Sequence, residues 1–461
     1  MRKSNLIKAL ALVVCVFMFA TVMVGCGSSS SSSSTEASTV AATTAPASSA
    51  PAAATSIKDV KGTLNFWHFQ QAEVANMKTA IAKELPNITF NVQVTPDTQL
   101  AYQNKLSAAI RANSGMPDAL AVESAFAKKF INMEGVFDDL SAAPYNAAEV
   151  TKTMIPYTVD IGKDKGGVLR ALSHQGTPGA IGYKRDVAKK YLGTDDPAAI
   201  ADMISSSDKM LETAKKLSDA SKGVAKLWVG FEDVYQMYRG ARSAGWVDKD
   251  SNLVIDQKMT DYLDFMKKMR DGKYEGAIRA WTPAWNAAIA DDKHLLFSIP
   301  TWGIANIIDA NDKTHKDQGR WGLAKSPLSW FWGGTWYGVY SKTQNKEVAW
   351  AFVKWFTADK DHLKQWAKDV GDFVNQTELI NELTNDDSFV NKTLNQNPYK
   401  IYGPLVADIN GSIFTEQDDV INNDWLNLSE TYLAGKLGTK DDMLKKFKDK
   451  VKTDFPNLKI Q

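Results

Sequence analysis

The feature that most constrains the fold is an alternation of strand-like and helix-like segments near the start of the folded part. Segments 63–67 and 119–122 are short and apolar, and in 88–94 the apolar residues fall on alternate positions, as in a half-buried strand. Segments 72–85 and 102–112, which lie between them, have the spacing of amphipathic helices. A helix that connects two neighbouring strands makes them parallel, so this order predicts an α/β fold.

The alternation continues along the rest of the chain. Further strands are predicted at 168–172, 181–183 and 226–229, and further helices at 208–218, 232–244, 261–270, 345–356 and 441–451. Asn345 is predicted to cap the helix that follows it. The folded part, 57–461, has about 405 residues, which exceeds the size at which one hydrophobic core stops growing, so two lobes are expected.

The first 26 residues are predicted to be a targeting segment. Arg2, Lys3 and Lys8 are followed by the apolar run 9–24, which is too short for a membrane span. The run ends in Met-Val-Gly-Cys at 23–26, which resembles the lipobox of bacterial lipoproteins. That resemblance implies cleavage before Cys26 and a lipid on its thiol, and so a position on the outer face of the cell membrane. An ordinary secretory signal is the alternative.

Segment 27–56 is predicted to be a flexible tether. It contains seven consecutive serines, continues as a mixture of Ala, Thr, Ser and Pro, and has no aromatic residue. Such a composition cannot bury enough apolar surface to offset the entropy of the chain. We therefore expect it to hold the folded part away from the membrane surface.

Charge and cysteine content restrict the partners and the chemistry. Without the three cations of the targeting segment, 54 Lys and Arg become 51, against 53 Asp and Glu. This near-neutral balance argues against a nucleic-acid partner, which requires a basic face. Cys15 and Cys26 are the two cysteines, so the body after the tether can form no disulfide and no cysteine-ligated metal site. Export without disulfides is consistent with the outer surface of a Gram-positive cell.

The tryptophans are concentrated in one part of the chain. Ten of the 14 fall between Trp281 and Trp366, and the stretch 330–336 reads Trp-Phe-Trp-Gly-Gly-Thr-Trp. Flat aromatic faces suit a ligand with flat apolar faces and a hydroxylated rim, such as a sugar. The cluster therefore predicts a ligand cleft, with core packing as the alternative for any single tryptophan. Trp330, Trp332 and Trp336 are spaced by two, which predicts one shared face on a regular strand.

Several kinds of catalytic site are unsupported by the sequence. The chain has no Gly-rich phosphate loop, no dinucleotide fingerprint and no Gly-x-Ser-x-Gly elbow, and its five histidines are scattered. No cofactor and no metal are expected. Four carboxylates at the ends of predicted elements keep a surface-anchored glycoside hydrolase open as an alternative, although such groups also bind sugar hydroxyls without catalysis. They are Glu123, Glu232, Asp233 and Asp372.

The body resembles the extracellular solute-binding proteins of ABC importers, in the carbohydrate-binding branch related to maltose-binding proteins. The segments that carry the resemblance occur in the order of that family, at 64–68, 115–120, 135–140, 170–186, 297–302, 330–350 and 369–373. The resemblance implies an α/β, two-lobed, periplasmic-binding-protein-like fold with a hinge and a ligand cleft between the lobes. It also implies that the protein captures a sugar or oligosaccharide by hinge closure and is not an enzyme. A non-sugar solute on the same scaffold is a further alternative.

The resemblance implies lobe boundaries, partners and site residues. Lobe 1 would comprise 57–172 and 293–338, and lobe 2 would comprise 173–292 and 339–461. The partners would be the sugar and the membrane permease subunits, with the protein as a lipid-anchored monomer. The implied ligand-binding residues are Trp67, His68, Phe69, Gln71, Glu123, Ser124, Gln175, Thr177, Glu232, Asp233, Tyr235, Trp281, Trp302, Trp330, Trp332, Trp336 and Asp372.

Overall fold

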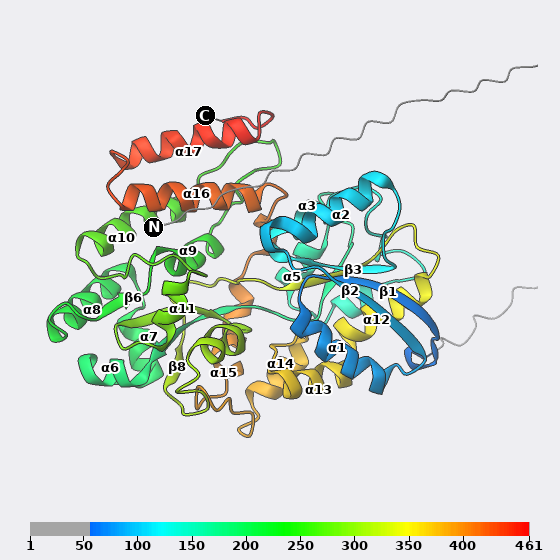
Figure 1. The fold of residues 1–461 in the computed structure, drawn as a ribbon, viewed down its shortest axis with the longest axis horizontal. Helices are drawn as coiled ribbons and strands as arrows, with labels where there is room; N and C mark the ends of the chain where they lie inside the picture. Colours follow the sequence, from blue (N-terminus) through cyan, green and yellow to red (C-terminus); the bar gives the residue numbers. More distant parts are fainter. Residues whose placement is uncertain (1–55, 461) are drawn as a thin grey trace, which may run out of the picture. The chain divides into compact units, whose positions relative to one another are not determined.

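The computed structural model describes residues 56–460, which contain two β-sheets with helices packed around each (Figure 1). The predicted signal segment 1–26, its Cys26 and the tether up to residue 55 lie outside the described residues. The α/β class and the two-lobed architecture are confirmed. Within residues 56–460 no helix combines the length and the apolar character that a membrane crossing requires.

The first sheet has five strands in the order β2-β1-β3-β9-β4. β1 is parallel to β2 and to β3, with Gly62 opposite Ile88, whereas β9 is antiparallel to β3 and β4. Helices α1, α3 and α12 pack against this sheet. The bounds are β1 Gly62–His68, β2 Ile88–Val94, β3 Ala119–Glu123, β4 Leu172–Ser173, β9 Thr335–Val339, α1 Gln71–Glu84, α2 Ala101–Ala112, α3 Ser124–Ile131 and α12 Lys346–Ala358.

The second sheet has four strands in the order β6-β7-β5-β8. β6 is parallel to β7, and β5 is antiparallel to both β7 and β8. Helices α6, α8 and α9 pack against these strands, α10 packs on α9, and α16 packs on α17 (Figure 1). The bounds are β5 Gly179–Lys184, β6 Lys226–Trp228, β7 His294–Pro300, β8 Trp321–Ala324, α6 Arg185–Leu192, α7 Pro197–Met203, α8 Ser207–Ala220, α9 Phe231–Gly240, α10 Gln257–Asp271, α16 Asp418–Leu433 and α17 Lys440–Asp454.

The remaining elements are short helices that connect these layers. The α-helices are α4 Ala148–Thr151, α5 Pro156–Gly162, α11 Pro283–Ala290, α13 Lys360–Val370, α14 Thr377–Thr384 and α15 Tyr399–Tyr402. The 3₁₀ segments are η1 Ile57–Asp59, η2 Thr98–Leu100, η4 Gly403–Asp408 and η5 Gly411–Ile413, and η3 Ile304–Asp309 is π-helical. Buried apolar side chains form two clusters, so the fold has two hydrophobic cores, as expected for its length.

Two segments that connect the sheets run side by side. The chain passes from β4 to β5 through residues 174–178 and from β8 to β9 through residues 325–334. The Trp332 N–H donates to the carbonyl of Thr177 (3.1 Å), and the Thr177 hydroxyl donates to the carbonyl of Gly333 (3.0 Å). These bonds pair the two crossings, and residues 373–375 pair with the first crossing on its other side through Gly176 N–H to Phe373 O and Asn375 N–H to His174 O, both 2.8 Å.

Strand pairing departs from the expected lobe boundaries. β7 and β8 pair within the second sheet, although 293–338 was assigned to lobe 1. α12 packs on the first sheet, although 339–461 was assigned to lobe 2, whereas β9, all of it but Val339 assigned to lobe 1, is in the first sheet. The physical reason is that β7 is buried along its whole length and is hydrogen-bonded on both edges, to β5 and to β6, which makes it a central strand of the second sheet.

Two local predictions also differ from the structure. Asn345 makes no side-chain cap, because its Nδ2 donates instead to Asp118 Oδ1 at 3.0 Å, across to the loop before β3. Of the strand expected at 168–172, only Leu172 is in a strand, the two-residue β4 Leu172–Ser173. The strand 88–94 has its predicted bounds, because its alternating apolar residues mark a half-buried edge strand clearly.

Candidate functional site

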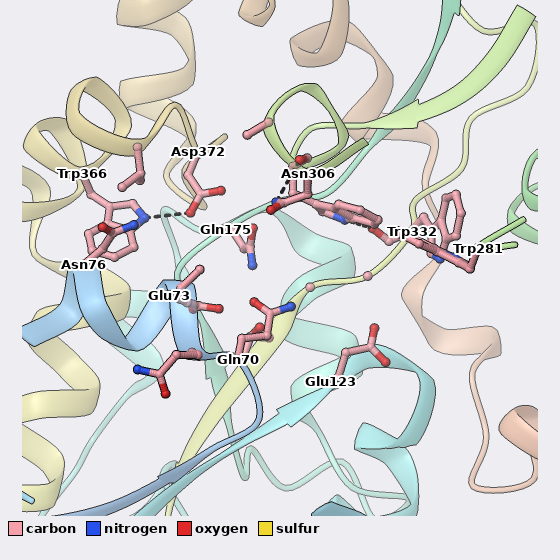
Figure 2. Close-up of a pocket in the computed structure, with 18 residues that line it drawn as sticks. Gln70, Glu73, Asn76, Glu123, Gln175, Trp281, Asn306, Trp332, Trp366 and Asp372 are labelled. Carbon is pink, nitrogen blue, oxygen red and sulfur yellow. Dashed lines mark hydrogen bonds between the residues drawn. The ribbon is translucent and has the colours of Figure 1, made fainter. Parts of the chain in front are cut away.

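A cavity of about 640 Å³ lies where loops from both sheets meet (Figure 2). This volume is within the range of small-molecule sites, roughly 300–1,000 Å³. The cavity lies at the carboxyl ends of β1, β3 and β7, where open α/β sheets bind ligands. Its lining residues are Gln70, Gln71, Ala72, Glu73, Asn76, Glu123, Gln175, Trp281, Trp302, Ala305, Asn306, Trp332, Gly333, Gly334, Thr335, Trp366, Val370 and Asp372.

One end of the cavity is formed by three tryptophans in mutual contact. The rings of Trp281 and Trp302 are nearly parallel, 16° apart, with centroids separated by 6.0 Å. Trp332 stands edge-on to both, at 5.8 Å from Trp281 and 5.5 Å from Trp302. Because the rings touch each other, a cation cannot enter between them as in an aromatic cage. The cluster instead offers its outer faces as a stacking surface, which we call the tryptophan platform.

Trp281 has an unusual backbone conformation for such a large residue. Its φ is +62°, in the left-handed region that bulky side chains rarely adopt, and its side chain is 52% exposed. It lies just before α11, whose first turn is capped by Thr282. A strained backbone that presents an exposed indole to a cavity is typical of a ligand-binding position, since neither feature helps the fold.

The opposite end of the cavity contains a network of carboxylates and imidazoles. Glu73 accepts the Tyr337 hydroxyl and faces the Nε2 atoms of His68 (3.6 Å) and His174 (3.8 Å). Burial alone would raise the pKa of Glu73, but the His68 imidazole and the hydrogen bonds from His68 and Tyr337 lower it to about 2. Glu73 is therefore ionised and held in place at neutral pH.

Asp372 is held by two donors on a single oxygen. Its Oδ2 accepts the Trp366 indole N–H at 2.7 Å and lies 3.2 Å from His174 Nε2. Trp366 also packs edge-on against Phe356, so the indole is fixed from both sides. Its Oδ1 makes no hydrogen bond among the described residues. Asp372 thus has a free acceptor atom at the cavity wall.

Glu123 caps α3 at the cavity wall. One carboxylate oxygen accepts the Ala125 N–H (2.9 Å) and the other accepts the Ser124 hydroxyl (2.7 Å). Burial raises the pKa of Glu123 above its ordinary value, although these bonds and the Arg239 guanidinium oppose that effect. The carboxylate is therefore positioned by its own helix.

Seven of the predicted ligand-binding residues line the cavity, and ten do not. The seven are Gln71, Glu123, Gln175, Trp281, Trp302, Trp332 and Asp372. The ten placed elsewhere are Trp67, His68, Phe69, Ser124, Thr177, Glu232, Asp233, Tyr235, Trp330 and Trp336. Each of the ten is engaged by partners within the protein.

Trp330 and Trp336 were expected to stack on a ligand, but they are packed inside the protein. Trp330 is 0% exposed and donates its Nε1 to Ser326 Oγ (2.9 Å), and Trp336 is 1% exposed and donates to the carbonyl of Thr158 (2.8 Å). The three tryptophans do not share one strand face, because β9 begins only at Thr335. Gly333 and Gly334 before it have φ of +75° and +107°, which breaks the extended geometry.

The three predicted residues on α9 also have structural partners. Asp233 is fully buried and accepts the Ser298 N–H (2.9 Å) and the Trp285 indole N–H (3.0 Å). Glu232 lies 3.6 Å from the Arg279 guanidinium, and the Tyr235 hydroxyl donates to Asn422 (2.7 Å). These contacts hold α9 on the second sheet and on its neighbouring helices, away from the cavity.

The remaining five predicted residues support the site from behind or lie beside it. Lys105 places its ammonium 3.6 Å from the centre of the Trp67 ring and so covers that face. Phe69 packs on the His68 imidazole, with ring centres 4.8 Å apart, and His68 contacts Glu73. Ser124 and Thr177 direct their hydroxyls to Glu123 and to the carbonyl of Gly333.

Six polar or aromatic lining residues were not among the predicted site residues: Gln70, Glu73, Asn76, Asn306, Thr335 and Trp366. Glu73 and Asn76 are three residues apart on α1, so they share a face with the loop residue Gln70. The run of polar residues directly after the first strand was the available signal. Asn306 lies one helical turn after Trp302 and donates to its carbonyl (3.1 Å). Trp366 was interpreted as a packing residue, and it both packs and lines the cavity.

The arrangement can stack a flat ring at one end and accept hydrogen bonds at the other. Among residues 56–460, no group of three or more His, Cys, Asp or Glu side chains is placed to hold a metal ion. The polar groups around the cavity are fixed by contacts within the protein, which is how a binding site orients a ligand with few polar contacts.

Comparison with known proteins identifies the family. The profile of the bacterial extracellular solute-binding proteins matches residues 76–387. No protein of curated function matches the sequence. Among solved structures, one described as an extracellular solute-binding protein family 1 superposes with a TM-score of 0.74 at 17% identity, covering 84% of this chain and 99% of its own.

Two further similar structures were solved in complex with ligands. The GacH receptor of Streptomyces glaucescens, solved unliganded and with acarbose, gives a TM-score of 0.67 at 18% identity, covering 87% of this chain and 100% of its own. The galacto-N-biose-/lacto-N-biose I-binding protein of an ABC transporter from Bifidobacterium longum, solved with lacto-N-biose, gives 0.68 at 15% identity, covering 87% and 99%. At these identities the superpositions establish the fold. The profile match spans more than half of the chain, and the protein therefore belongs to the bacterial extracellular solute-binding protein family.

Proposed function

We propose that the protein is the ligand-capturing component of an ABC importer and that its ligand is a sugar, in particular an oligosaccharide. The observation that carries this proposal is the tryptophan platform facing carboxylates and carboxamides across one cavity. A sugar ring has an apolar face that stacks on an indole and a rim of hydroxyls that bond to carboxylates. The ligands bound in the similar structures, acarbose and lacto-N-biose, support the same ligand class.

Capture would occur by closure of the two lobes around the ligand. The cavity wall includes α1 and Glu123 from the first sheet's side and Trp281 and Trp302 from the second. A ligand that touches both sides has a higher affinity for the closed state and shifts the population toward it. The paired crossings at 174–178 and 325–334 would serve as the hinge, because few residues there need to change conformation. Closure would then present a defined surface to a membrane permease.

The N-terminal sequence supports a proposed location on the membrane surface. A lipid on Cys26 and a tether at 27–56 would hold the folded part on the outer face of the membrane, close to the permease. A second acyl chain is needed for stable anchoring, since a single chain binds a membrane only reversibly. The protein is proposed to act as a monomer without a cofactor.

A surface glycoside hydrolase remains the second candidate, because two of its four candidate carboxylates, Glu123 and Asp372, line the cavity. The other two, Glu232 and Asp233, are held by Arg279, Ser298 and Trp285 away from it. Incubating the folded part with a panel of oligosaccharides and following the products by chromatography separates the two functions. Binding without new products is expected, and cleavage that Asp372→Asn abolishes would establish the hydrolase.

The binding proposal is tested by calorimetric titration and thermal shift with mono- and oligosaccharides. Ligand that binds only the folded state raises the unfolding temperature, so one panel finds the best sugar. Trp302→Ala is then expected to weaken that sugar's binding by roughly 5- to 150-fold, on the order of 1–3 kcal/mol for one stacking platform. The matched control is Trp350→Ala, a half-buried tryptophan of α12 that packs on Tyr145 outside the cavity lining. Equal effects of the two variants would contradict the proposal.

A further inference from the structure

The charged side chains that line the cavity are all acidic. Three of its lining residues are carboxylates, Glu73, Glu123 and Asp372, and none is a lysine or an arginine. Among the described residues, no Lys or Arg nitrogen lies within 4.0 Å of any of the three carboxylates. Arg239 on α9 is a countercharge that acts on Glu123 from beyond that distance. Glu73 and Asp372 at the other end have two imidazoles and the Tyr337 hydroxyl at close range, and no lysine or arginine.

Both imidazoles direct Nε2 at the carboxylates of this end of the cavity. His68 Nδ1 accepts the Gln70 N–H at 2.8 Å, and its Nε2 faces Glu73 at 3.6 Å. His174 directs Nε2 toward Asp372 and Glu73, and its Nδ1 is buried without a partner among the described residues. The imidazoles therefore orient the two carboxylates, and no lysine or arginine takes part in this network.

The same end of the cavity has unused acceptors directed at a ligand. Asp372 keeps Oδ1 free, because Trp366 and His174 both occupy Oδ2. Gln175 lies on the first crossing with its side chain only 7% exposed, and its Oε1 has no hydrogen-bond partner among the described residues. Figure 2 shows Gln175 between Asp372 and Gln70, pointing into the cavity. Two carboxylates and an unpaired amide carbonyl around one space require a ligand group with several N–H or O–H donors.

We propose that this cavity ranks sugars by charge, binding those with a free ammonium group above neutral sugars and neutral sugars above uronic acids. The ammonium would lie between Glu73 and Asp372, both of which have an oxygen within 4 Å of the same His174 nitrogen. It would donate to Asp372 Oδ1 and Gln175 Oε1, while a sugar ring stacks on the tryptophan platform. The platform requires a ring, because its touching indoles leave no cage for a simple amine. This inference rests on the proposed sugar-binding function.

Matched probes test the ranking directly. Glucose, glucosamine and glucuronate share one ring stereochemistry, and galactose, galactosamine and galacturonate share another. Titration of each at pH 6.5, where the amines are protonated, is expected to give the amino sugar about tenfold tighter binding than its neutral parent. The uronate is expected to bind at least about tenfold more weakly than the parent. These factors correspond to about 1.4 kcal/mol each.

Variants then locate the effect. Asp372→Asn and Glu73→Gln remove one charge each at nearly constant shape, and each is expected to bring the glucosamine-to-glucose ratio close to one. The control is Asp369→Asn, the same chemical change at an exposed residue of α13 outside the cavity lining, and it should keep the parent's ratio. Circular dichroism melts confirm that each variant is folded before titration.

The outcomes separate the inference from the function on which it rests. Neutral sugars that bind with no preference for the amines, or uronates that bind best, would overturn the charge ranking and leave sugar binding intact. If both Asp372→Asn and Glu73→Gln keep the parent's glucosamine-to-glucose ratio, the proposed ammonium position is wrong. No binding by any of the six probes, nor by the oligosaccharide panel, would count against the sugar-binding function itself.

Discussion

Trp302 donates its indole N–H to the backbone carbonyl of Trp332 at 2.7 Å, so the two rings of the platform are joined by a hydrogen bond as well as by contact. Trp302 follows β7, whereas Trp332 lies in the second crossing, 30 residues further along the chain. The bond fixes the orientation of the Trp302 ring against the hinge segment. The platform is therefore rigid before a ligand arrives, which reduces the entropy lost on binding.

A substitution at Trp281 should change the sugar affinity while leaving the free energy of unfolding nearly unchanged. Trp281→Gly is expected to weaken binding of the best sugar by roughly 5- to 150-fold through loss of a stacking face. The free energy of unfolding should change by less than about 1 kcal/mol, because glycine adopts the positive φ without strain and this offsets the lost contacts of a half-exposed ring. Calorimetric titration and urea unfolding measure the two quantities. A large loss of stability with unchanged affinity would place Trp281 in the fold rather than in the site.

Trp336 should behave in the opposite way. Trp336→Ala removes a buried indole and its hydrogen bond to Thr158, which is expected to cost about 3–5 kcal/mol of unfolding free energy. The affinity of the folded fraction for the best sugar should change by no more than about threefold, since this side chain lies outside the cavity lining. Thermal melts and titration at low temperature provide the comparison. Loss of binding without loss of stability would show that Trp336 contacts the ligand.

Glu73 should make the protein sensitive to acid. Its pKa is lowered from 4.5 to about 2 in the folded state, so its contribution to stability is present above pH about 4.5 and is lost as the pH falls toward 2. The size of this contribution is on the order of 3 kcal/mol. Glu73→Gln should therefore flatten the fall in unfolding free energy between these pH values. The control is Glu149→Gln in an exposed pair with Lys152, which should leave the pH profile unchanged.

Asp233 should make the stability fall as the pH rises, which is the opposite of the effect of Glu73. Burial raises the pKa of Asp233 from 3.8 to about 7, despite opposing hydrogen bonds from Ser298 and Trp285. The folded state then keeps a proton that the unfolded chain has released, so stability falls as the pH rises from about 4 to about 7. Asp233→Asn cannot titrate and should lose this part of the pH profile. Denaturant unfolding at pH 4, 5.5 and 7 checks the slope, and an unchanged slope in the variant would show that Asp233 is not its source.

Cys26 should determine where the protein is found. Cys26→Ser removes the thiol that a lipid would modify, so the protein is expected to leave the membrane fraction while its sugar affinity stays the same. Mass spectrometry of the parent from its native membrane should show an acylated N-terminal cysteine at position 26. A parent protein that begins elsewhere and carries no lipid would contradict the anchoring proposal.

The sequence alone determined the α/β class and the position of most elements, because hydrophobic periodicity is a local property. Segment 88–94 has its predicted bounds for this reason, and the family resemblance implied Gln71 and Glu123, which line the cavity after the first and third strands. The profile of the family matches most of the body, as the resemblance implied. Local patterns also placed tryptophans near a cleft, since Trp281, Trp302 and Trp332 line the cavity.

Only the tertiary structure decided which tryptophans face the cavity and which are buried. The Trp336 side chain is held inside the protein by its hydrogen bond to the carbonyl of Thr158, 178 residues away in the sequence. Asp372 is oriented by His174, 198 residues away. Trp332 and Trp336 are close in sequence, but the positive φ angles of Gly333 and Gly334 turn the chain between them. Burial depends on which distant segments supply the partners and on the backbone angles that those partners hold in place, and a pattern of neighbouring residues contains neither.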